Sequence, residues 1–525
     1  MAGLVGKFFS VGSATMASRV LGFVREALIA GFLGAGPVAD AFYAAFRFPN
    51  LFRRLFAEGA FNTAFVPLFA KELEAKGTDG ARRFAEEVLA ALLAVLLLIS
   101  AVAMLFMPVL VGTIIAPKFA DDPAKFALTV ELTRIMFPFL TAMSLVAMFS
   151  GILNSFRRYF LAALAPVIMN VVFIVVLTGA WYLGASDRTL GISMAWGVFL
   201  SGLLQVSMLV YGILKEGFPL SLRRPSISRP VRRLVTLAIP TAIAAGITQV
   251  NLLVGQIIAS GQDGAIAIMN YADRLMQLPL GVIAISIGVV LLPELTRALA
   301  TGDAGEATKL QNRSIEFGLG LTLPAAVGLF TIPVPLIALL YERGAFTRDL
   351  TEITASVLAW FAVGLPAFVL IKIFQPAYYA REDMKTPMWF SGANAIVNVT
   401  LALLLFPVYG VAGLAIATSA AGWLNVVLLG GALWRQGLLQ LDAATIRNSG
   451  IIVAASLLVG LVLWAGQGIF SEMLLHDALG IRIFSVLALI LVAMLVYFAI
   501  TIGTGAIPGQ QLLRLLRRPR KNSAT

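Results

Sequence analysis

The chain has 525 residues, of which 59% are hydrophobic and 13% are charged, about half the charged fraction of an ordinary soluble domain. This composition excludes a soluble enzyme and a disordered protein. The chain has no cysteine, which excludes disulfides, zinc–thiolate sites and iron–sulfur clusters. His476 is the only histidine in the sequence, and this argues against histidine-based metal sites and catalytic triads.

Apolar runs of about 20 residues or more, the length of a membrane-spanning helix, recur along nearly the whole chain. The runs are continuous rather than alternating, which favours helices over a β-barrel. We predict fourteen spans, at residues 8–34, 38–70, 84–115, 126–153, 159–183, 190–214, 232–260, 264–298, 312–341, 350–380, 387–407, 410–434, 449–468 and 481–504. The sequence therefore predicts an all-α integral membrane protein.

The basic residues predict how the chain is oriented, because Lys and Arg collect in cytoplasmic connections. Most of the 39 Lys and Arg residues lie at the termini and in the even-numbered connections. The odd-numbered connections carry only Lys118, Lys125, Arg188, Arg343, Arg348 and Arg482. We therefore expect both termini in the cytoplasm. The net charge of +12 then needs no nucleic-acid partner.

The chain divides at a basic stretch, residues 223–233, which contains two prolines. A weak internal repeat supports the division, because Val66-Pro67-Leu68 ends span two and Leu292-Pro293-Glu294 ends span eight. Two lobes of six spans fit a transporter. We predict an N-terminal lobe at 1–222, a C-terminal lobe at 223–440, and a final helix pair with a basic tail at 441–525.

Eight basic residues fall inside the predicted spans: Arg19, Arg25, Arg47, Arg53, Arg54, Arg134, Arg274 and Lys372. Each costs about 2.5–3.5 kcal/mol in the bilayer centre on insertion scales, so each needs a partner, water or a cavity. Fewer acids lie at similar depth, namely Glu26, Glu58, Glu131, Asp273 and, near an interface, Asp40. The membrane region therefore carries surplus positive charge.

Helix geometry predicts which of these charges are paired. Glu131 and Arg134 are i, i+3 neighbours, so we expect them to bond each other. One stripe of span two carries Arg47, Arg54 and Glu58 and can neutralise itself in part. Arg53 points about 100° away from that stripe.

In span one, Arg19 and Glu26 share a face but lie two turns apart, and Arg25 lies about 120° away. A bend or unwinding at Gly22 would let both arginines reach one cavity. Unpaired guanidinium groups in a transporter cavity would bind an anion, with phosphate the best geometric match. We expect this role for Arg19, Arg25, Arg53 and Arg274, with internal structural pairing as the alternative.

Enzymatic interpretations have little support in the sequence. A phosphatase or transferase needs a nucleophile, a base or metal-binding carboxylates gathered at one depth, and His476 lies beside Asp477 in a predicted outer connection. The glycines at 31, 34 and 36 are not followed by the Lys of a phosphate loop. We expect no catalytic site, no metal site and no cofactor.

Several segments resemble one known family. Ser18–Glu26 and Phe48–Phe61, the latter followed by Ala64-Phe65-Val66-Pro67, resemble signatures of the MurJ (MviN) family of bacterial lipid II flippases. Tyr271–Leu275 and Arg381–Pro387 are similar to later segments of that family. The resemblance runs from about residue 4 to the last predicted span.

The resemblance implies the fold of the MOP transporter superfamily, two six-helix lobes around a central cavity, plus two C-terminal helices that form a groove. It implies transport of lipid II, undecaprenyl-diphosphate-linked MurNAc-pentapeptide-GlcNAc, from the inner to the outer leaflet of the bacterial inner membrane for peptidoglycan synthesis. The arginines important in the family fall on Arg19, Arg25, Arg53 and Arg274. We expect supporting cavity or gating roles for Glu26, Asp40, Asn50, Glu58, Asp273 and Lys372.

The resemblance also implies that some relatives have a sodium site with acidic residues in spans seven and eleven. Here these spans contain no carboxylate and offer the amides of Gln249, Asn251, Asn394 and Asn398. The expected energy source is the membrane potential or an ion gradient. The expected partners are lipid II, membrane lipids and proteins of cell-wall synthesis. The alternatives are a polysaccharide-unit flippase or drug exporter of the same superfamily, a membrane scaffold for cell-wall enzymes, and an integral membrane lipid enzyme.

Overall fold

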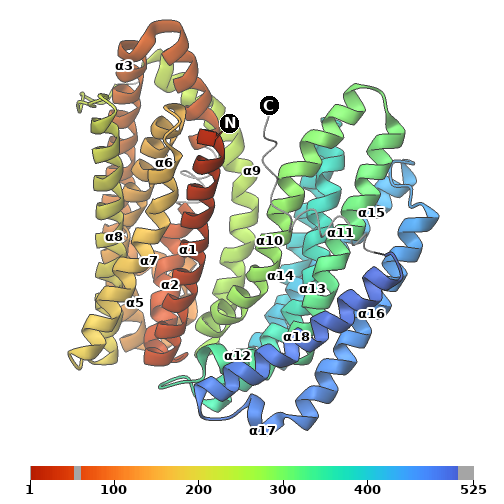
Figure 1. Cartoon of the computed structure of the whole chain (residues 1–525). Helices are drawn as coiled ribbons and strands as arrows, with labels where there is room; N and C mark the ends of the chain where they lie inside the picture. Colours follow the sequence, from red (N-terminus) through yellow and green to blue (C-terminus); the bar gives the residue numbers. More distant parts are fainter. Residues whose placement is uncertain (1, 53–60, 227, 507–525) are drawn as a thin grey trace. The chain divides into compact units, whose positions relative to one another are not determined.

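The computed structural model describes residues 2–52, 61–226 and 228–506, and every regular element in these ranges is a helix (Figure 1). Ten helices in the described ranges are long and apolar enough to cross a bilayer. The other predicted spans, at 8–34, 38–70, 232–260 and 264–298, also overlap described helices. The prediction of an all-α membrane protein is confirmed, and the structure is consistent with fourteen spans.

The chain forms two compact units, and the first comprises Met1–Asn270 together with Arg343–Thr347. Its long helices are α1 (Ala2–Leu33), α2 (Pro37–Phe52), α3 (Asn62–Leu105), α5 (Pro123–Met136), α6 (Phe139–Ser155), α7 (Tyr159–Tyr182), α8 (Asp187–Lys215) and α9 (Arg229–Ala259). Three short helical segments, α4 (Met107–Leu110), η2 (Val111–Ile115) and η3 (Pro117–Asp121), connect α3 to α5. The first turns of α10 (Ala265–Ala300) also belong to this unit.

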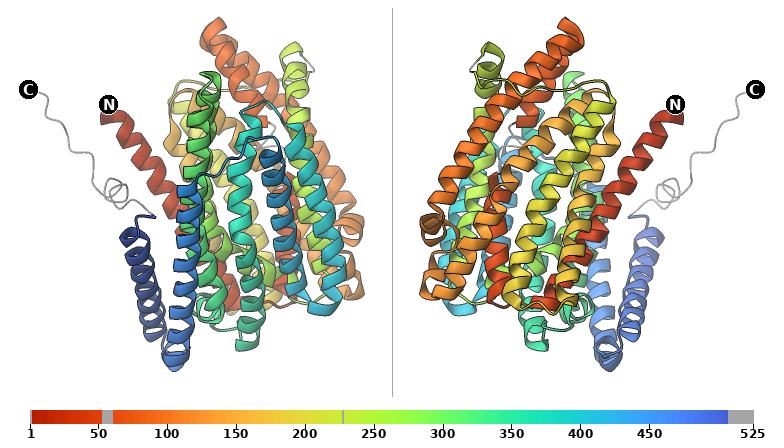
Figure 2. Two further views of the ribbon diagram at one scale, coloured as in Figure 1. Left: turned by 90° about the vertical axis from the view of Figure 1, so that its right-hand side faces the viewer. Right: turned by 90° about the vertical axis from the view of Figure 1, so that its left-hand side faces the viewer.

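The second unit comprises Tyr271–Glu342 and Arg348–Thr525. It contains the rest of α10 and the helices α11 (Ala304–Thr331), α12 (Pro333–Tyr341), α13 (Arg348–Tyr379), α14 (Lys385–Tyr409), α15 (Val411–Arg435), α16 (Ala443–Ile469), α17 (Ser471–Leu474) and α18 (Leu479–Gly503). Helices α16 and α18 lie side by side as a hairpin (Figure 2). The lobe boundaries at residues 222 and 440 stay a prediction.

Two predicted spans are each divided into two helices, and α3 continues through a predicted loop with one break. The predicted span 126–153 is two helices, α5 and α6, separated at Pro138, and the predicted span 312–341 is α11 and α12, separated just before Pro333. Proline lacks the backbone N–H that would continue the helical hydrogen-bond ladder, so each helix ends there. In α3 the break falls at Gly77, whose φ of +66° is open to glycine at little cost.

The connection from α8 to α9 lies against α3. Glu86 of α3 accepts hydrogen bonds from the backbone N–H of Ser221 (3.0 Å) and from Nε of Arg223 (2.6 Å). The hydroxyl of Ser228 donates to Glu87 (2.7 Å) and also caps the start of α9. The basic stretch predicted to divide the chain is therefore held by carboxylates of the first unit.

Candidate functional site

Arg25 of α1 forms a buried ion pair with the residue that follows it. Its Nη2 lies 2.6 Å from Oε1 of Glu26, and its Nη1 donates to Oδ1 of Asn170 on α7 at 3.0 Å. The guanidinium also lies over the ring of Phe173, 5.4 Å from the ring centroid. Arg25 is 7% exposed and Glu26 is 1% exposed, so this pair is held away from solvent.

The other oxygen of Glu26 is also satisfied. Oε2 accepts hydrogen bonds from Tyr43 of α2 (2.6 Å) and from Asn270 of α10 (3.2 Å). Asn170 in turn donates to the carbonyl of Ser18 (2.9 Å), one turn before Gly22 on α1. The network joins α1, α2, α7 and the first turns of α10, and its hydrogen bonds offset the cost of burying two charges.

This geometry corrects one expectation from the sequence. Arg25 is paired, whereas the count of charges left it without an acid. Helix α1 is not interrupted at Gly22; the side chain of Asn170 lies there, 3.6 Å from the place a Cβ would take. Arg19 is half-buried on the same helix and takes part in no ion pair within the described part of the chain. The role of the two arginines in substrate binding stays a prediction.

The remaining predicted residues lie in several different parts of the chain. Arg53, Arg54 and Glu58 lie outside the described residues, as does the basic tail from Arg514 to Lys521. Arg47 and Asn50 are half-buried on α2, and each has an interaction partner. Arg274 and Asp273, on the part of α10 in the second unit, are half-buried and also have partners.

Within this second unit Gln277 donates to Asp273 one turn along α10, and Lys372 is exposed on α13. The sequence segment Arg381–Pro387 contains the turn before α14. Asp383 accepts hydrogen bonds there from the backbone N–H groups of Thr386 (3.0 Å) and Lys385 (3.1 Å). These bonds hold the pKa of Asp383 below its ordinary value, because they stabilise the carboxylate.

A second buried charge cluster lies where α2, α5 and α10 begin. Asp40 is fully buried and accepts a hydrogen bond from Nζ of Lys125 at 2.9 Å. It also accepts from the backbone N–H groups of Gly264 (2.7 Å) and Ala267 (3.0 Å), and so it caps the N-terminus of α10. Lys125 bonds Asp263 as well, at 2.9 Å. Asp40 therefore holds the α9–α10 turn to α2 and α5.

A backbone hydrogen bond and a close backbone approach also join segments at this end of the first unit. The N–H of Ala345 donates to the carbonyl of Gly31 at 2.8 Å. A Cβ at Gly344, where φ is +56°, would come within 2.2 Å of the same carbonyl, so only glycine fits. The segment 343–347 and the α9–α10 turn lie far along the chain from Gly31 and Asp40, and both are bonded to this end of the first unit. We call the residues Asp40, Lys125, Asp263 and Gly264 with the 343–347 segment the end clasp.

The sequence does not identify Lys125 and Asp263 as members of a site. Both fall in connections between the predicted spans, where charges are ordinary. The Asp263-Gly264 pair is a turn signal, but nothing in its spacing indicates contact with residues 40 and 125. The expected pair of Glu131 and Arg134 is wrong as well: Glu131 bonds Arg188 of α8 (2.9 Å), while Nε of Arg134 donates to the carbonyl of Met104 (3.1 Å).

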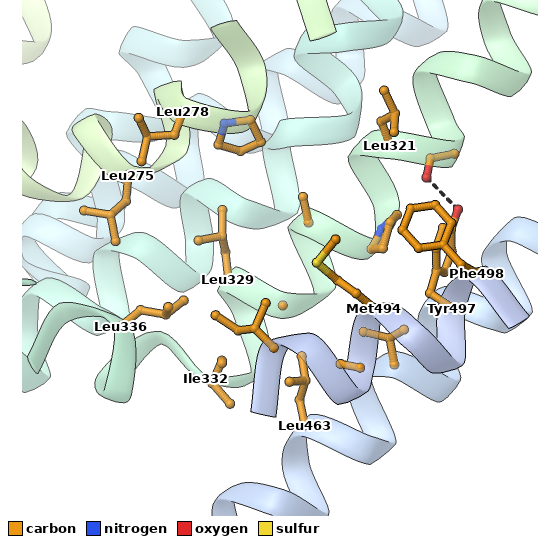
Figure 3. Close-up of a pocket in the computed structure, with 18 of the residues that line it drawn as sticks. Leu275, Leu278, Leu321, Leu329, Ile332, Leu336, Leu463, Met494, Tyr497 and Phe498 are labelled. Atoms are coloured by element: carbon orange, nitrogen blue, oxygen red, sulfur yellow. Dashed lines mark hydrogen bonds between the residues drawn. The ribbon is translucent and has the colours of Figure 1, made fainter. Parts of the chain in front are cut away.

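The second unit contains an apolar groove of about 400 Å³ between α10, α11, α12, α16 and α18 (Figure 3). Leu275, Leu329, Leu336, Leu463 and Met494 are among the side chains that line it. Its polar side chain, the hydroxyl of Tyr497, donates to the carbonyl of Gly320 (2.5 Å). The side chains that line the groove are almost all apolar, so the groove is suited to an apolar chain.

Arg482 fixes one end of the helices around this groove. It is 5% exposed at the start of α18. Its Nη1 donates to the carbonyl of Ala338 on α12 (2.9 Å), and its Nη2 lies 3.6 Å from Glu342. Its Nε donates to the carbonyl of His476 (3.0 Å). Arg482 therefore ties α18 to α12.

Known proteins are similar to this chain over nearly its full length. The family model described as lipid II flippase MurJ matches residues 29–502. A probable lipid II flippase MurJ of Rhizobium tropici is 50% identical over 523 residues, which cover 99% of this chain and 98% of the relative. The lipid II flippase MurJ of Burkholderia cenocepacia is 35% identical, covering 87% and 89% of the two chains.

The fold of this chain is also similar to solved structures of known transporters. A lipid II flippase MurJ in an inward closed conformation superposes with a TM-score of 0.77 at 25% identity and covers 97% of this chain and 99% of that one. An inward-facing MATE family multidrug transporter of the MOP superfamily shares the fold, with a TM-score of 0.68 at 16% identity, covering 82% of this chain and 98% of that one. On the match of family model, relatives and structure, the chain belongs to the MurJ family.

Proposed function

We propose that this protein is a lipid II flippase, which moves undecaprenyl-diphosphate-linked MurNAc-pentapeptide-GlcNAc from the inner to the outer leaflet of the bacterial inner membrane. The observation that carries the proposal is the 50% identity to a probable MurJ flippase along almost the whole chain. The arginines on the membrane helices and the apolar groove beside α16 and α18 fit the two chemical parts of that lipid.

The diphosphate would be bound by arginines. A guanidinium group matches phosphate oxygens with two parallel hydrogen bonds and stays charged when it is desolvated. Arg19 is the described arginine best suited to direct contact, since it is half-buried and outside any ion pair with described residues. The proposal for Arg53 and Arg274 rests on the family resemblance. Arg25, bonded to Glu26 and Asn170, would act mainly by holding α1 in place.

The polyprenyl tail would lie in the groove of the second unit. Burial of each CH₂ group away from water is worth about 0.8 kcal/mol, but a tail inside a bilayer is already out of water. The groove would therefore bind the tail through packing contacts rather than by removing it from water. Its hydrocarbon walls would guide the tail while the polar head group crosses.

Alternating access would require the end clasp to open. Asp40 accepts three hydrogen bonds there. The positive-inside pattern supports an orientation in which this end faces the outside of the cell and both termini lie in the cytoplasm. A closed outer end would admit substrate from the inner leaflet. Release to the outer leaflet would then separate Asp40 from the N-terminus of α10, where water replaces the lost bonds.

The membrane potential would favour the outward step. Moving two negative charges outward across about 100 mV, inside negative, yields roughly 4–5 kcal/mol. The surplus positive charge of the empty carrier would be drawn inward and would reset it.

Complementation of a bacterium depleted of its own MurJ tests the function. We expect the wild-type chain to restore growth, and Arg19→Ala and Arg274→Ala to fail while inserting at wild-type levels. Lys118→Ala, an exposed cation in a connection, serves as the matched control and should restore growth. Growth with all arginine variants would favour a scaffold for cell-wall enzymes over a flippase.

A further inference from the structure

Arg134 is a cation of a candidate membrane span that the proposed transport does not use. It is exposed on α5, and Nε donates to the carbonyl of Met104 at 3.1 Å. The acid expected to neutralise it, Glu131, bonds Arg188 instead. Within the residues that the structure describes, the two terminal amino groups of Arg134 have no hydrogen-bond partner.

Arg134 borders a groove of about 540 Å³ on the first unit. Pro108 of α4, Ile135 of α5, and Ile192 and Trp196 of α8 supply apolar walls, and Glu131 and Arg134 are the charged side chains that line it. Because Glu131 and Arg188 neutralise each other, the groove carries a net charge of about +1 from Arg134. A negatively charged ligand with an apolar body complements this lining.

The position of Arg134 along α5 matches the depth of lipid phosphates. Glu131 bonds Arg188, the second residue of α8, and Arg134 lies one turn, about 4.5 Å, further along α5. Helix α8 has 29 residues, or about 43 Å, so it exceeds a hydrocarbon core of about 30 Å by roughly 6 Å at each end. Arg134 therefore lies near the boundary between head groups and hydrocarbon.

We propose that this groove binds an anionic phospholipid of the surrounding leaflet, with the phosphodiester on Nη1 and Nη2 of Arg134 and an acyl chain along Ile192 and Trp196. The bond to Met104 fixes the plane of the guanidinium, so its two free amino groups are presented together to phosphate oxygens. The proposed orientation makes this the outer leaflet. The site is separate from the lipid II site and does not depend on transport.

Native mass spectrometry of the delipidated full-length protein tests the proposal, with phosphatidylglycerol added as the probe. We expect the wild type to bind one phosphatidylglycerol at least about tenfold more tightly than Arg134→Gln, the loss of a charge-assisted hydrogen-bond pair. Lys118→Gln removes the same charge from an exposed position outside the groove and should bind as the wild type does. Equal binding by Arg134→Gln and the wild type would overturn the proposal.

Three further comparisons identify the ligand. Ile192→Trp fills the groove while leaving Arg134 intact, and we expect it to weaken binding as well; unchanged binding would overturn the place of the acyl chain. Phosphatidylcholine should bind at least severalfold more weakly, and equal binding would overturn the preference for negative charge. Inorganic phosphate should not compete at equal concentration, and full competition would indicate a site for free anions.

Discussion

Lys125 and Asp40 bond each other at 2.9 Å across 85 residues of sequence, and neither side chain is more than 2% exposed. The same carboxylate caps the first turn of α10. One acid thus joins α2, α5 and α10 at a single end of the first unit. In the proposed cycle this end opens, and water would then replace the hydrogen bonds of the charged pair.

We predict that weakening the end clasp exposes Ala35. Asp40→Asn keeps the shape but removes the charge that Lys125 and the start of α10 require, so the clasp should open more often. Ala35 is 7% exposed and lies against Gly264. The chain has no cysteine, so in an Ala35→Cys variant the introduced thiol is the single site of maleimide labelling. Its maleimide labelling should accelerate at least severalfold in the Asp40→Asn background.

The matched control for this experiment is Asp303→Asn, which removes a carboxylate from the N-cap of α11, away from the clasp. Labelling at Ala35→Cys should then stay at the wild-type rate. Equal rates in the Asp40→Asn and wild-type backgrounds would mean that Asp40 does not hold this end closed.

The pair of Arg25 and Glu26 should stabilise the protein only as a pair. Glu26→Gln leaves a buried guanidinium without its counter-charge, and we expect a loss of about 3–5 kcal/mol in unfolding free energy. The double variant Arg25→Met/Glu26→Gln leaves neither charge of the pair buried. Its free energy of unfolding should fall by less than that of the Glu26→Gln single variant. Thermal unfolding in detergent of Glu26→Gln, Arg25→Met and the double variant measures the three losses. Strictly additive losses would contradict a coupled buried pair.

Glu342 offers a direct comparison of a buried and an exposed arginine. Arg482 is buried and bonds two backbone carbonyls as well as Glu342, while the side chain of Arg348 is 40% exposed. We predict that Arg482→Met lowers the free energy of unfolding by at least about 2 kcal/mol, because it leaves buried acceptors unpaired. Arg348→Met should lower it by less than about 1 kcal/mol. Similar losses for both, measured by thermal unfolding, would mean that Arg482 does not tie α18 to α12.

The groove in the second unit should distinguish long prenyl tails from short ones. Ala493→Phe places a ring among Leu463, Ile490 and Met494 of the lining and reduces the space for a chain. We expect weaker binding of lipid II with its full tail, by about tenfold, and unchanged binding of a short-tailed analogue. Microscale thermophoresis in detergent can measure both. If the two lipids lose affinity equally, the groove does not bind the tail.

Hydropathy predicted the helices well because the bilayer demands long apolar segments whose backbone bonds are internal. It did not predict that Pro138 and Pro333 would divide two of those segments, because a proline inside a membrane helix is often tolerated. The family segments at Ser18–Glu26 and Tyr271–Leu275 indicated the right family.

The pairing of charges could not be predicted from helix geometry. Glu131 has Arg134 one turn away, yet it bonds Arg188 of a neighbouring helix. Lys125 and Asp40 are 85 residues apart, and no periodicity connects them. Such contacts depend on how helices pack, and a single sequence holds no record of that packing.

The most direct test of the account is lipid II transport in proteoliposomes under an imposed membrane potential. Fluorescent lipid II that reaches the opposite leaflet becomes accessible to an external quencher that cannot cross the bilayer. We predict that transport by the wild type speeds up when the potential draws the diphosphate towards the receiving side. We expect transport by Arg19→Ala to be at least about tenfold slower. Transport by Arg19→Ala at the wild-type rate, with no response to the sign of the potential, would contradict recognition of the diphosphate by the membrane arginines.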